Sequence, residues 1–164
     1  MIRLANLNDL KAIISIYQEA KVRMKAAQIK QWEGDYPNQK LLEEDILGGH
    51  LFVFVSAHLV VGVMAVFKEE ITYQNIIGSW LNDKPYRVIH RIAVKEGYTN
   101  QGIALKMLDF VLNHYQQDLK IDTHPDNIPM QKLLKKAQFV YCGKTYIGPK
   151  SNDLRWCYQK LYQG

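Results

Sequence analysis

The sequence predicts a single mixed α/β domain, with a central mixed sheet of about seven strands and helices on both faces. Its length of 164 residues is that of one domain, and no linker or internal repeat interrupts it. Short runs rich in Val, Ile and Phe alternate with segments whose apolar residues recur at helical spacing. In the middle of the chain, a strand, a glycine loop, a helix and a strand predict one parallel crossover, to which flanking hairpins add antiparallel strands. The predicted domain spans residues 1–164.

The first third of the chain is predicted to form one strand and two helices. Residues 2–4 are apolar enough for a short strand, and Asn6 followed by Asp9 is typical of a helix N-terminus. Apolar residues then keep helical spacing through residues 7–26. A second helix holds residues 41–46 and ends at the glycines 48 and 49.

The remaining elements follow from composition and periodicity. Val-rich and Phe-rich runs predict strands at residues 51–57 and 60–67, joined at His58 and Leu59. Helical spacing of apolar residues predicts helices at 103–115 and 127–137. Further strands are expected at residues 86–94, 119–122, 139–147 and 154–161. Residues 68–85 follow no clear pattern.

Composition excludes several classes of protein. Apolar residues make up 48% and charged residues 23% of the chain, no apolar run approaches the roughly 20 residues that span a bilayer, and no secretion signal opens it. The net charge of +5 is diffuse, with its densest cluster at Lys132, Lys135 and Lys136. We therefore expect a cytoplasmic protein with no membrane partner and no nucleic-acid partner, although a basic helix that binds nucleic acid is an alternative.

The two cysteines, Cys142 and Cys157, form no motif with each other or with histidines. No metal site is expected, because the spacing of zinc ligands is absent. Two unclustered cysteines without a secretion signal fit a reducing compartment. We interpret them as buried strand thiols, with a nucleophilic cysteine as the alternative.

The most informative segment is residues 89–105, where a strand ends, a loop with two glycines follows and a long helix begins. A helix N-terminus offers unpaired N–H groups and a partial positive charge, which suit a phosphate or pyrophosphate. Gly102 lets a ligand approach the backbone, and Ala104 keeps the first helical turn small. The loop is neither a P-loop nor a dinucleotide fingerprint. A plain strand-to-helix turn is the alternative to an anion site.

Residues 99–104 resemble the signature Gln/Arg-x-x-Gly-x-Gly/Ala of the GNAT superfamily of acyl-CoA-dependent N-acyltransferases. Gly102 and Ala104 match the signature, whereas Thr99 stands where Gln or Arg is usual. The resemblance implies acetyl-CoA as cosubstrate and a mostly antiparallel sheet that splays between its fourth and fifth strands. It implies that the pyrophosphate rests on the backbone amides of Thr99, Asn100, Gln101, Gly102, Ile103 and Ala104. The pantetheine arm is expected to pair with the strand end Ile92, Ala93 and Val94.

A second block, residues 121–139, strengthens the resemblance. Asn127 stands where the family tends to start a helix with asparagine, and is expected to contact the coenzyme. Phe139 fits the Gly-Phe pair that follows this helix, but Gln138 replaces the glycine. The pairs Gln31–Trp32 and Tyr36–Pro37 look like those of a bacterial subgroup, so the resemblance covers the whole chain.

The resemblance implies direct attack of an amine on the thioester in a ternary complex. A backbone N–H of Ile92 or Ala93 would stabilise the developing oxyanion. Many family members use a tyrosine seven residues after the asparagine as general acid, and here that position is Leu134. His90 and His124 are the candidates for proton transfer, with structural histidines as the alternative.

Aromatic residues in the irregular segments are candidates for the acceptor pocket. Trp32, Tyr36 and Trp80 combine an apolar body with a polar group, which suits a small-molecule or peptide amine; loop packing is the alternative. The predicted activity is N-acetyl transfer to a primary amine by a monomer or homodimer. A non-catalytic CoA-binding sensor is the alternative that Leu134 favours.

Overall fold

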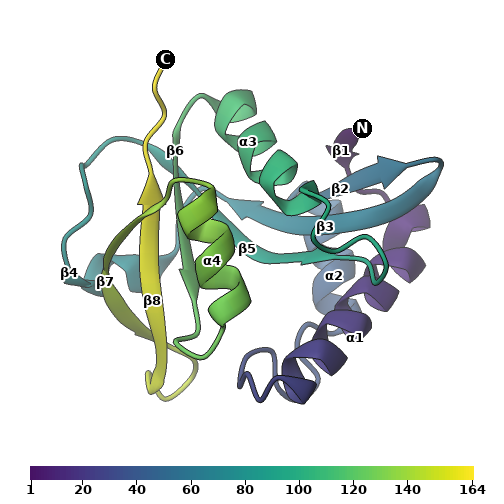
Figure 1. Ribbon diagram of the computed structural model, residues 1–164, viewed down its shortest axis with the longest axis horizontal. Coiled ribbons are helices and arrows are strands. Elements are labelled where there is room, and N and C mark those ends of the chain that lie inside the picture. The colour runs from purple at the N-terminus through teal and green to yellow at the C-terminus, as the bar shows by residue number, and fades with distance from the viewer. The chain divides into compact units, whose positions relative to one another are not determined.

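The computed structural model describes residues 1–164, whose helices and strands are labelled in Figure 1. The chain divides into two compact units. Unit 1 comprises Met1–Val66 and His90–Phe110, and unit 2 comprises Phe67–Ile89 and Val111–Gly164. Strand β5 (Tyr86–Val94) and helix α3 (Ile103–Tyr115) each contribute residues to both units. The single domain expected over residues 1–164 stays a prediction.

The strands form one hydrogen-bonded sheet with the order β1-β2-β3-β5-β6-β8-β7-β4. It has eight strands rather than about seven. The pairs β1–β2, β2–β3, β4–β7, β6–β8 and β7–β8 are antiparallel, whereas β5 and β6 pair in parallel. The mixed, mostly antiparallel sheet predicted from the sequence is therefore confirmed. The additional strand, β4 (Ile77–Gly78), lies in residues 68–85, for which no helix or strand was predicted.

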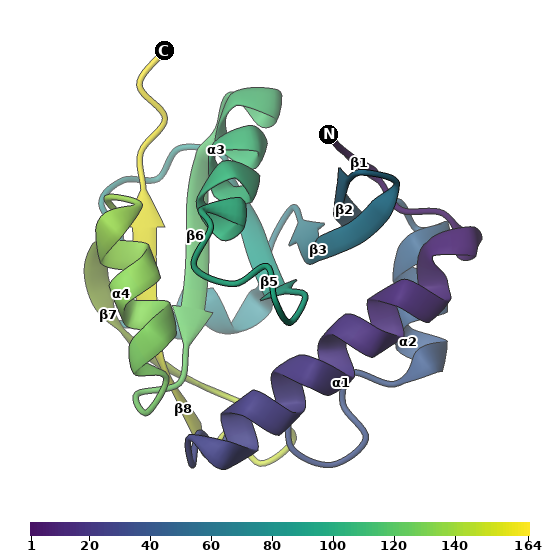
Figure 2. The same cartoon turned by 45° about the vertical axis from the view of Figure 1, so that its right-hand side comes forward.

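Unit 1 contains, besides parts of β5 and α3, the elements β1 (Ile2–Leu4), the 3-10 helix η1 (Leu7–Asp9), α1 (Leu10–Ala26), α2 (Gln39–Leu47), β2 (Leu51–Ser56) and β3 (Leu59–Phe67, all but its last residue). The predicted start at Asn6 is confirmed by a capping box, in which Asp9 accepts a hydrogen bond from the Asn6 amide at 2.9 Å. The first turn is a 3-10 helix, after which α1 buries Ile13, Ile16, Tyr17 and Ala20 as one stripe. Figure 2 shows α1 beside α2.

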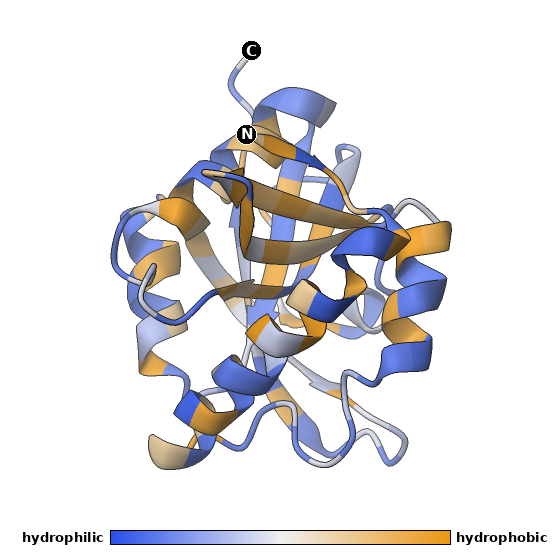
Figure 3. Cartoon of the chain, turned by 90° about the vertical axis from the view of Figure 1, so that its right-hand side faces the viewer, coloured by the Kyte–Doolittle hydropathy of each residue, from blue (hydrophilic) through white to orange (hydrophobic).

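The hairpin β2–β3 supplies much of the core of unit 1. Both strands are almost continuously apolar, which Figure 3 shows as orange strands facing the viewer, and most of their residues are buried. The turn lies one residue earlier than predicted, at Ala57 and His58, which have φ angles of 46° and 67°. Two consecutive residues with positive φ are typical of the tight hairpin turn whose twist matches the strands.

Unit 2 contains the 3-10 helix η2 (Ile71–Asn75), β4, β6 (Asp118–Thr123), α4 (Ile128–Lys136), β7 (Val140–Ile147) and β8 (Asp153–Lys160), together with the start of β5 and the end of α3. Strands β5 and β6 pair in parallel from Tyr86 opposite Asp118 to Ile89 opposite Ile121. This confirms the parallel pair expected from the strand–loop–helix–strand unit.

Two glycines face each other where β4 pairs with β7. A Cβ on Gly143, whose φ is +149°, would lie 2.3 Å from the Ile77 carbonyl oxygen, and one on Gly78 would lie 2.3 Å from the Cys142 oxygen. The close pairing therefore depends on the absence of side chains at both positions.

Gly143→Ala is expected to destabilise the protein by about 3 kcal/mol or more, because the methyl group forces β4 away from β7 and the backbone angle is strained. Urea denaturation followed by circular dichroism measures the change. Gly148→Ala is the matched control, since its φ is +86° but its Cβ would meet nothing nearer than 3.8 Å. Equal losses in the two variants would show that backbone angle alone matters.

No helix in the structure has both the length and the apolar character that crossing a membrane requires.

Candidate active site

The loop of residues 95–102 links β5 to α3 within unit 1. It contains three residues with positive φ, namely Gly97 at 82°, Asn100 at 59° and Gly102 at 79°. A Cβ at Gly97 or at Gly102 would meet no atom within 4 Å, so the backbone at both glycines faces open space. Helical bonding begins with the Lys106 amide, which donates to the Gly102 carbonyl at 3.0 Å. The amides that precede Lys106 in the first turn therefore have no partner within the helix.

Helix α1 fixes the start of this loop. Glu19 accepts hydrogen bonds from the Glu96 amide at 2.7 Å and from Lys95 Nζ at 3.2 Å. Arg23 donates to the Val94 carbonyl at 2.9 Å. These contacts could not be predicted from local sequence, because each joins residues more than 70 positions apart.

Strand β5 presents its backbone in two directions beyond Arg91. The Lys95 amide donates to the Val61 carbonyl of β3 at 2.8 Å. Since polar groups alternate along a strand, those of Ile92 and Val94 point away from β3. The Val94 carbonyl meets Arg23 on that side, so the Ile92 amide is the better placed donor for a ligand at this edge.

The extended backbone of β5 is interrupted at Arg91, whose φ is 52°. A residue other than glycine in this region within a strand is typical of a β-bulge. Tyr17 of α1 holds the distortion, because its buried hydroxyl donates to the Arg91 carbonyl at 2.7 Å. Burial still alternates through His90, Arg91 and Ile92, as expected for a strand.

The Arg91 side chain lies in a buried polar cluster. Only 9% of the residue is exposed, its Nη2 pairs with Asp45 of α2, and its Nη1 donates to the Tyr36 hydroxyl at 2.9 Å. Burial raises the pKa of the Asp45 carboxyl, while the neighbouring Arg91 charge opposes that shift. His90 is close enough to Asp45 that a charge on its imidazole would also lower the Asp45 pKa.

The two aromatic acceptor candidates of unit 1 are both tied to this cluster. Tyr36 meets the Arg91 guanidinium directly and is 42% exposed. Trp32 packs edge-on against Tyr17, with ring centroids 5.5 Å apart. The structure thus brings Trp32 and Tyr36 together with the strand that carries His90, Ile92 and Ala93.

His124 lies in unit 2, just after β6. Its Nδ1 accepts a hydrogen bond from the Asp126 amide at 3.0 Å, so the neutral ring carries its proton on Nε2. Accepting a proton on Nδ1 requires this turn bond to break. His124 is therefore poorly arranged to serve as a base through that atom.

Asn127 caps helix α4, as its sequence position predicts. Its side-chain oxygen accepts a hydrogen bond from the Met130 amide at 3.1 Å, and the residue is 9% exposed. At the other end of α4, Gln138 has a φ of 65°, and the next amide bonds back to Leu134. This left-handed position explains why a glycine suits it better.

Trp80, the third acceptor candidate, packs inside unit 2. Its indole N–H donates to the Tyr73 carbonyl at 2.9 Å, and Lys120 Nζ lies 4.2 Å from its ring centroid. The Tyr73 hydroxyl donates to Asp122 at 2.6 Å, and burial raises the Tyr73 pKa well above its usual value. Trp80 is thus fixed by a network whose partners the sequence did not indicate.

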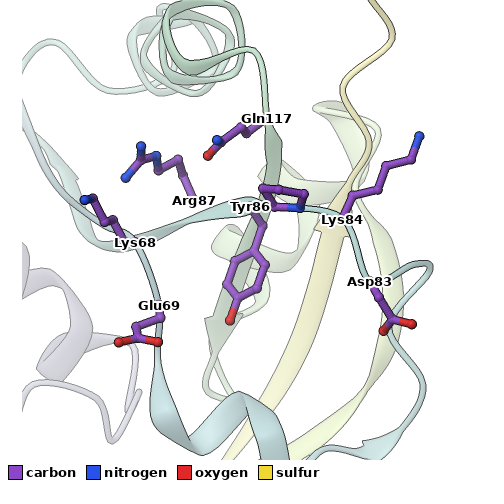
Figure 4. Close-up of a pocket in the computed structure, with 8 residues that line it drawn as sticks. Lys68, Glu69, Asp83, Lys84, Tyr86, Arg87 and Gln117 are labelled. Carbon is purple, nitrogen blue, oxygen red and sulfur yellow. The ribbon is translucent and has the colours of Figure 1, made fainter.

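A pocket of about 400 Å³ opens elsewhere in unit 2, and Figure 4 shows its lining. The polar ends of Lys68, Arg87 and Gln117 gather on one side, whereas Lys84 and Asp83 point away from them. None of the predicted site residues lines this pocket.

The cysteines agree with the sequence analysis. Cys142 and Cys157 are buried in β7 and β8 without a disulfide, and burial raises the Cys157 pKa to about 12. A thiol with so high a pKa is a poor nucleophile at neutral pH. The structure holds no group of three or more His, Cys, Asp or Glu side chains arranged to bind a metal.

The family profile described as "Acetyltransferase (GNAT) family" matches residues 11–139. The chain belongs to the GNAT family of acetyltransferases. Sequence and structure therefore place it among acyltransferase enzymes that use acetyl-CoA and act on amine acceptors.

Solved GNAT structures support the assignment. A GNAT-family acetyltransferase from Streptococcus agalactiae is 30% identical with a TM-score of 0.92, covering 100% of this chain and 96% of that one. A putative acetyltransferase from Staphylococcus aureus is 26% identical with a TM-score of 0.75, covering 99% of each chain. A ribosomal-protein-alanine N-acetyltransferase from Brucella melitensis, at 18% identity and a TM-score of 0.66, covers 98% of this chain and 99% of its own and shares the fold. No protein with a curated description matches the chain.

The chain departs from the GNAT pattern chiefly at the position of the usual general acid. Leu134, at the position where many GNAT members have a tyrosine, is fully buried in α4. An apolar side chain without a hydroxyl cannot donate a proton. Lys132, Lys135 and Lys136 of the same helix are exposed, as expected for a solvated face.

Proposed function

We propose that this GNAT enzyme transfers the acetyl group of acetyl-CoA to a primary amine of a small molecule or peptide, by direct attack in a ternary complex. The observation that carries the proposal is the loop before α3, where two open glycines and a fresh helix N-terminus expose backbone amides. This arrangement suits the doubly charged pyrophosphate of a coenzyme, because amides and the helix dipole both favour anions.

The binding roles follow from this placement. The amides of residues 99–104 hold the pyrophosphate, and the strand end Ile92, Ala93 and Val94 binds the pantetheine arm. The polar groups of Ile92 serve for this pairing, because Arg23 occupies the Val94 carbonyl. Asn127 is retained as a coenzyme contact of unit 2, in addition to its role as helix cap. Thr99 acts through its backbone, since its short side chain cannot make the contacts of Gln or Arg.

Charge stabilisation is assigned to the backbone of β5. Of the two candidate donors, the Ile92 amide donates to the oxygen on which negative charge develops during attack, because the Ala93 amide points toward β3 as that of Lys95 does. The bulge at Arg91 sets the direction of these amides, and Tyr17 holds the bulge in place. Acetyl-CoA itself supplies the activated acyl group.

Proton removal from the amine is assigned to His90 rather than to His124. His90 lies in unit 1 on the proposed acyl strand, whereas Nδ1 of His124 is engaged by the Asp126 amide. A neutral imidazole accepts a proton on a ring nitrogen, so His90 can take the proton of the amine directly or through water.

kcat/KM is expected to fall as the pH decreases from 8 to 6, because a larger fraction of the attacking amine becomes protonated. A pH profile with one good acceptor tests this. His90→Gln should lower kcat/KM throughout this range, because the amine then loses its proposed proton acceptor. His124→Gln is the matched control and should leave the profile unchanged; the reverse pattern would transfer the role to His124.

Thiol release from acetyl-CoA across a panel of amines tests the activity itself. Turnover of at least one primary amine, with acetylation of that amine confirmed by mass spectrometry, supports the proposal. Tight binding of coenzyme A by calorimetry without turnover of any amine would instead support a non-catalytic CoA-binding sensor. The buried Leu134, in place of the usual tyrosine, is the observation that favours this second function.

We further propose that the enzyme works in the bacterial cytoplasm. The solved neighbours cited above come from bacteria, and the two cysteines are buried in separate strands without a disulfide between them.

A further inference from the structure

The cluster around Arg91 is a costly feature that the proposed chemistry does not yet use. A buried ion pair adds little net stability, because desolvation of both charges opposes their attraction. Here Arg91 and Asp45 are paired with side-chain exposures of 6% and 10%. The residues that share this pair are therefore candidates for a positional role.

The hydrogen bond from Arg91 determines the role of the Tyr36 hydroxyl as donor or acceptor. Arginine only donates, so the Tyr36 oxygen accepts the bond from Arg91 Nη1 at 2.9 Å. The Tyr36 hydroxyl proton must then point to another acceptor. Since Tyr36 is 42% exposed, that acceptor can be a ligand.

The charge balance indicates what kind of ligand atom fits. Asp45 neutralises the Arg91 guanidinium, so the cluster presents no net positive charge to attract an anion. Its accessible group is a single neutral donor, the Tyr36 hydroxyl, polarised by the cation beside it. A carbonyl oxygen is the natural partner for such a donor.

The location links this donor to the reaction centre. Arg91 directly precedes Ile92, whose amide is the proposed oxyanion donor, and both residues lie in unit 1. Through Arg91, the Tyr36 hydroxyl is held by the same strand segment that handles the acyl group. Trp32, edge-on to Tyr17, adds an apolar surface tied to this segment.

We infer that Tyr36, positioned by Arg91, donates a hydrogen bond to a carbonyl oxygen next to the acceptor's amine. The preferred acceptors are then α-amino carbonyl compounds, such as amino-acid amides and peptide N-termini, rather than simple alkylamines. The inference rests on the proposed function. Tyr36 is the group that contacts the acceptor, and Arg91 is a positioning residue that acts through it.

The test compares phenylalaninamide with 2-phenylethylamine, which lacks only the carboxamide. We expect the wild-type protein to prefer the amide. Tyr36→Phe should lower kcat/KM for the amide about 3-fold to 10-fold, chiefly through KM, as expected for one hydrogen bond. It should change kcat/KM for the alkylamine less than about 2-fold. The different amine pKa values cancel, because the same pair is used with every variant.

Arg91→Lys tests the positioning role. Lysine keeps a positive charge near Asp45 but lacks the planar fork that reaches both Asp45 and Tyr36. It should reduce the preference for the amide as Tyr36→Phe does, and the double variant should lose no more than either single one. Tyr162→Phe is the matched control for loss of a phenol hydroxyl and should leave the ratio unchanged.

The possible results distinguish a failure of the Tyr36 assignment from a failure of the proposed acetyltransferase function. If the wild type acetylates amines but Tyr36→Phe leaves the ratio between the two acceptors unchanged, the assignment of Tyr36 is wrong and the proposed function stands. If the wild type binds coenzyme A and acetylates neither compound nor any other amine, the proposed function fails, and this inference fails with it.

Discussion

Gly102→Val is expected to weaken coenzyme A binding about 30-fold or more, a loss of about 2 kcal/mol. The pyrophosphate is proposed to bind the backbone amides of residues 99–104, and a valine side chain would occupy the open space in front of Gly102. Its β-branched side chain also strains a φ of +79°, which turns the neighbouring amides away from their present directions. Isothermal titration calorimetry with coenzyme A measures the effect.

Gly49→Val is the matched control for this experiment. Gly49, which follows α2 in unit 1, has a φ of +72° and equally open surroundings, so the backbone penalty is the same. Its affinity for coenzyme A should stay within about 2-fold of the wild type. A folded Gly102→Val protein that binds coenzyme A as tightly as this control would show that the amides of residues 99–104 do not bind the pyrophosphate.

Asp45→Ala is expected to destabilise the protein by about 3–5 kcal/mol, because it leaves the Arg91 guanidinium buried without its counter-charge. Tyr36 supplies only one neutral hydrogen bond in compensation. The free energy of unfolding from urea titration provides the measurement. Asp35→Ala, at an exposed position of the adjoining loop, should cost less than about 0.5 kcal/mol.

The double variant Asp45→Leu with Arg91→Met distinguishes the loss of a pair from the loss of one partner. Replacing both charges by apolar side chains of similar volume should recover most of the stability. At the same time it should abolish the preference for carbonyl-bearing acceptors, because Tyr36 loses its partner. An Asp45→Ala variant as stable as the wild type would mean that Arg91 reaches solvent and that the cluster imposes no geometry.

Elements with strong periodicity were predictable in full. The bounds of β1, β5 and α3 agree with the prediction. In α3, the helical spacing of apolar residues continues to the end of the helix. The hairpin turn was misplaced by one residue, since Ala57 and His58 adopt positive φ without the usual glycine or asparagine signal.

Residues 68–85 could not be predicted because distant partners define them. Thr145 donates a hydrogen bond to the Thr72 carbonyl of η2, and β4 is defined by its pairing with Gly143 and Lys144. Local sequence carries no record of such contacts.

In the candidate site, too, features made by neighbouring residues were predictable, whereas contacts between distant residues were not. The loop before α3 was visible in the sequence, because its chemistry depends on neighbouring glycines and a helix start. The Arg91 cluster was missed, since Asp45 and Tyr17 lie 46 and 74 positions away from it. The available signal was Arg91 itself, which lies among the apolar residues Ile89, Ile92 and Ala93 of β5, because a buried charge requires a partner.

The bond that Tyr17 makes to the bulge has a consequence in alkaline solution. Burial raises the pKa of the Tyr17 phenol far above its usual range, so the hydroxyl keeps its proton. Free amines are most abundant at high pH, where an ordinary surface tyrosine begins to ionise and ceases to donate. The hydrogen bond from Tyr17 to the distorted strand therefore persists at the alkaline pH at which free amine nucleophiles are most abundant.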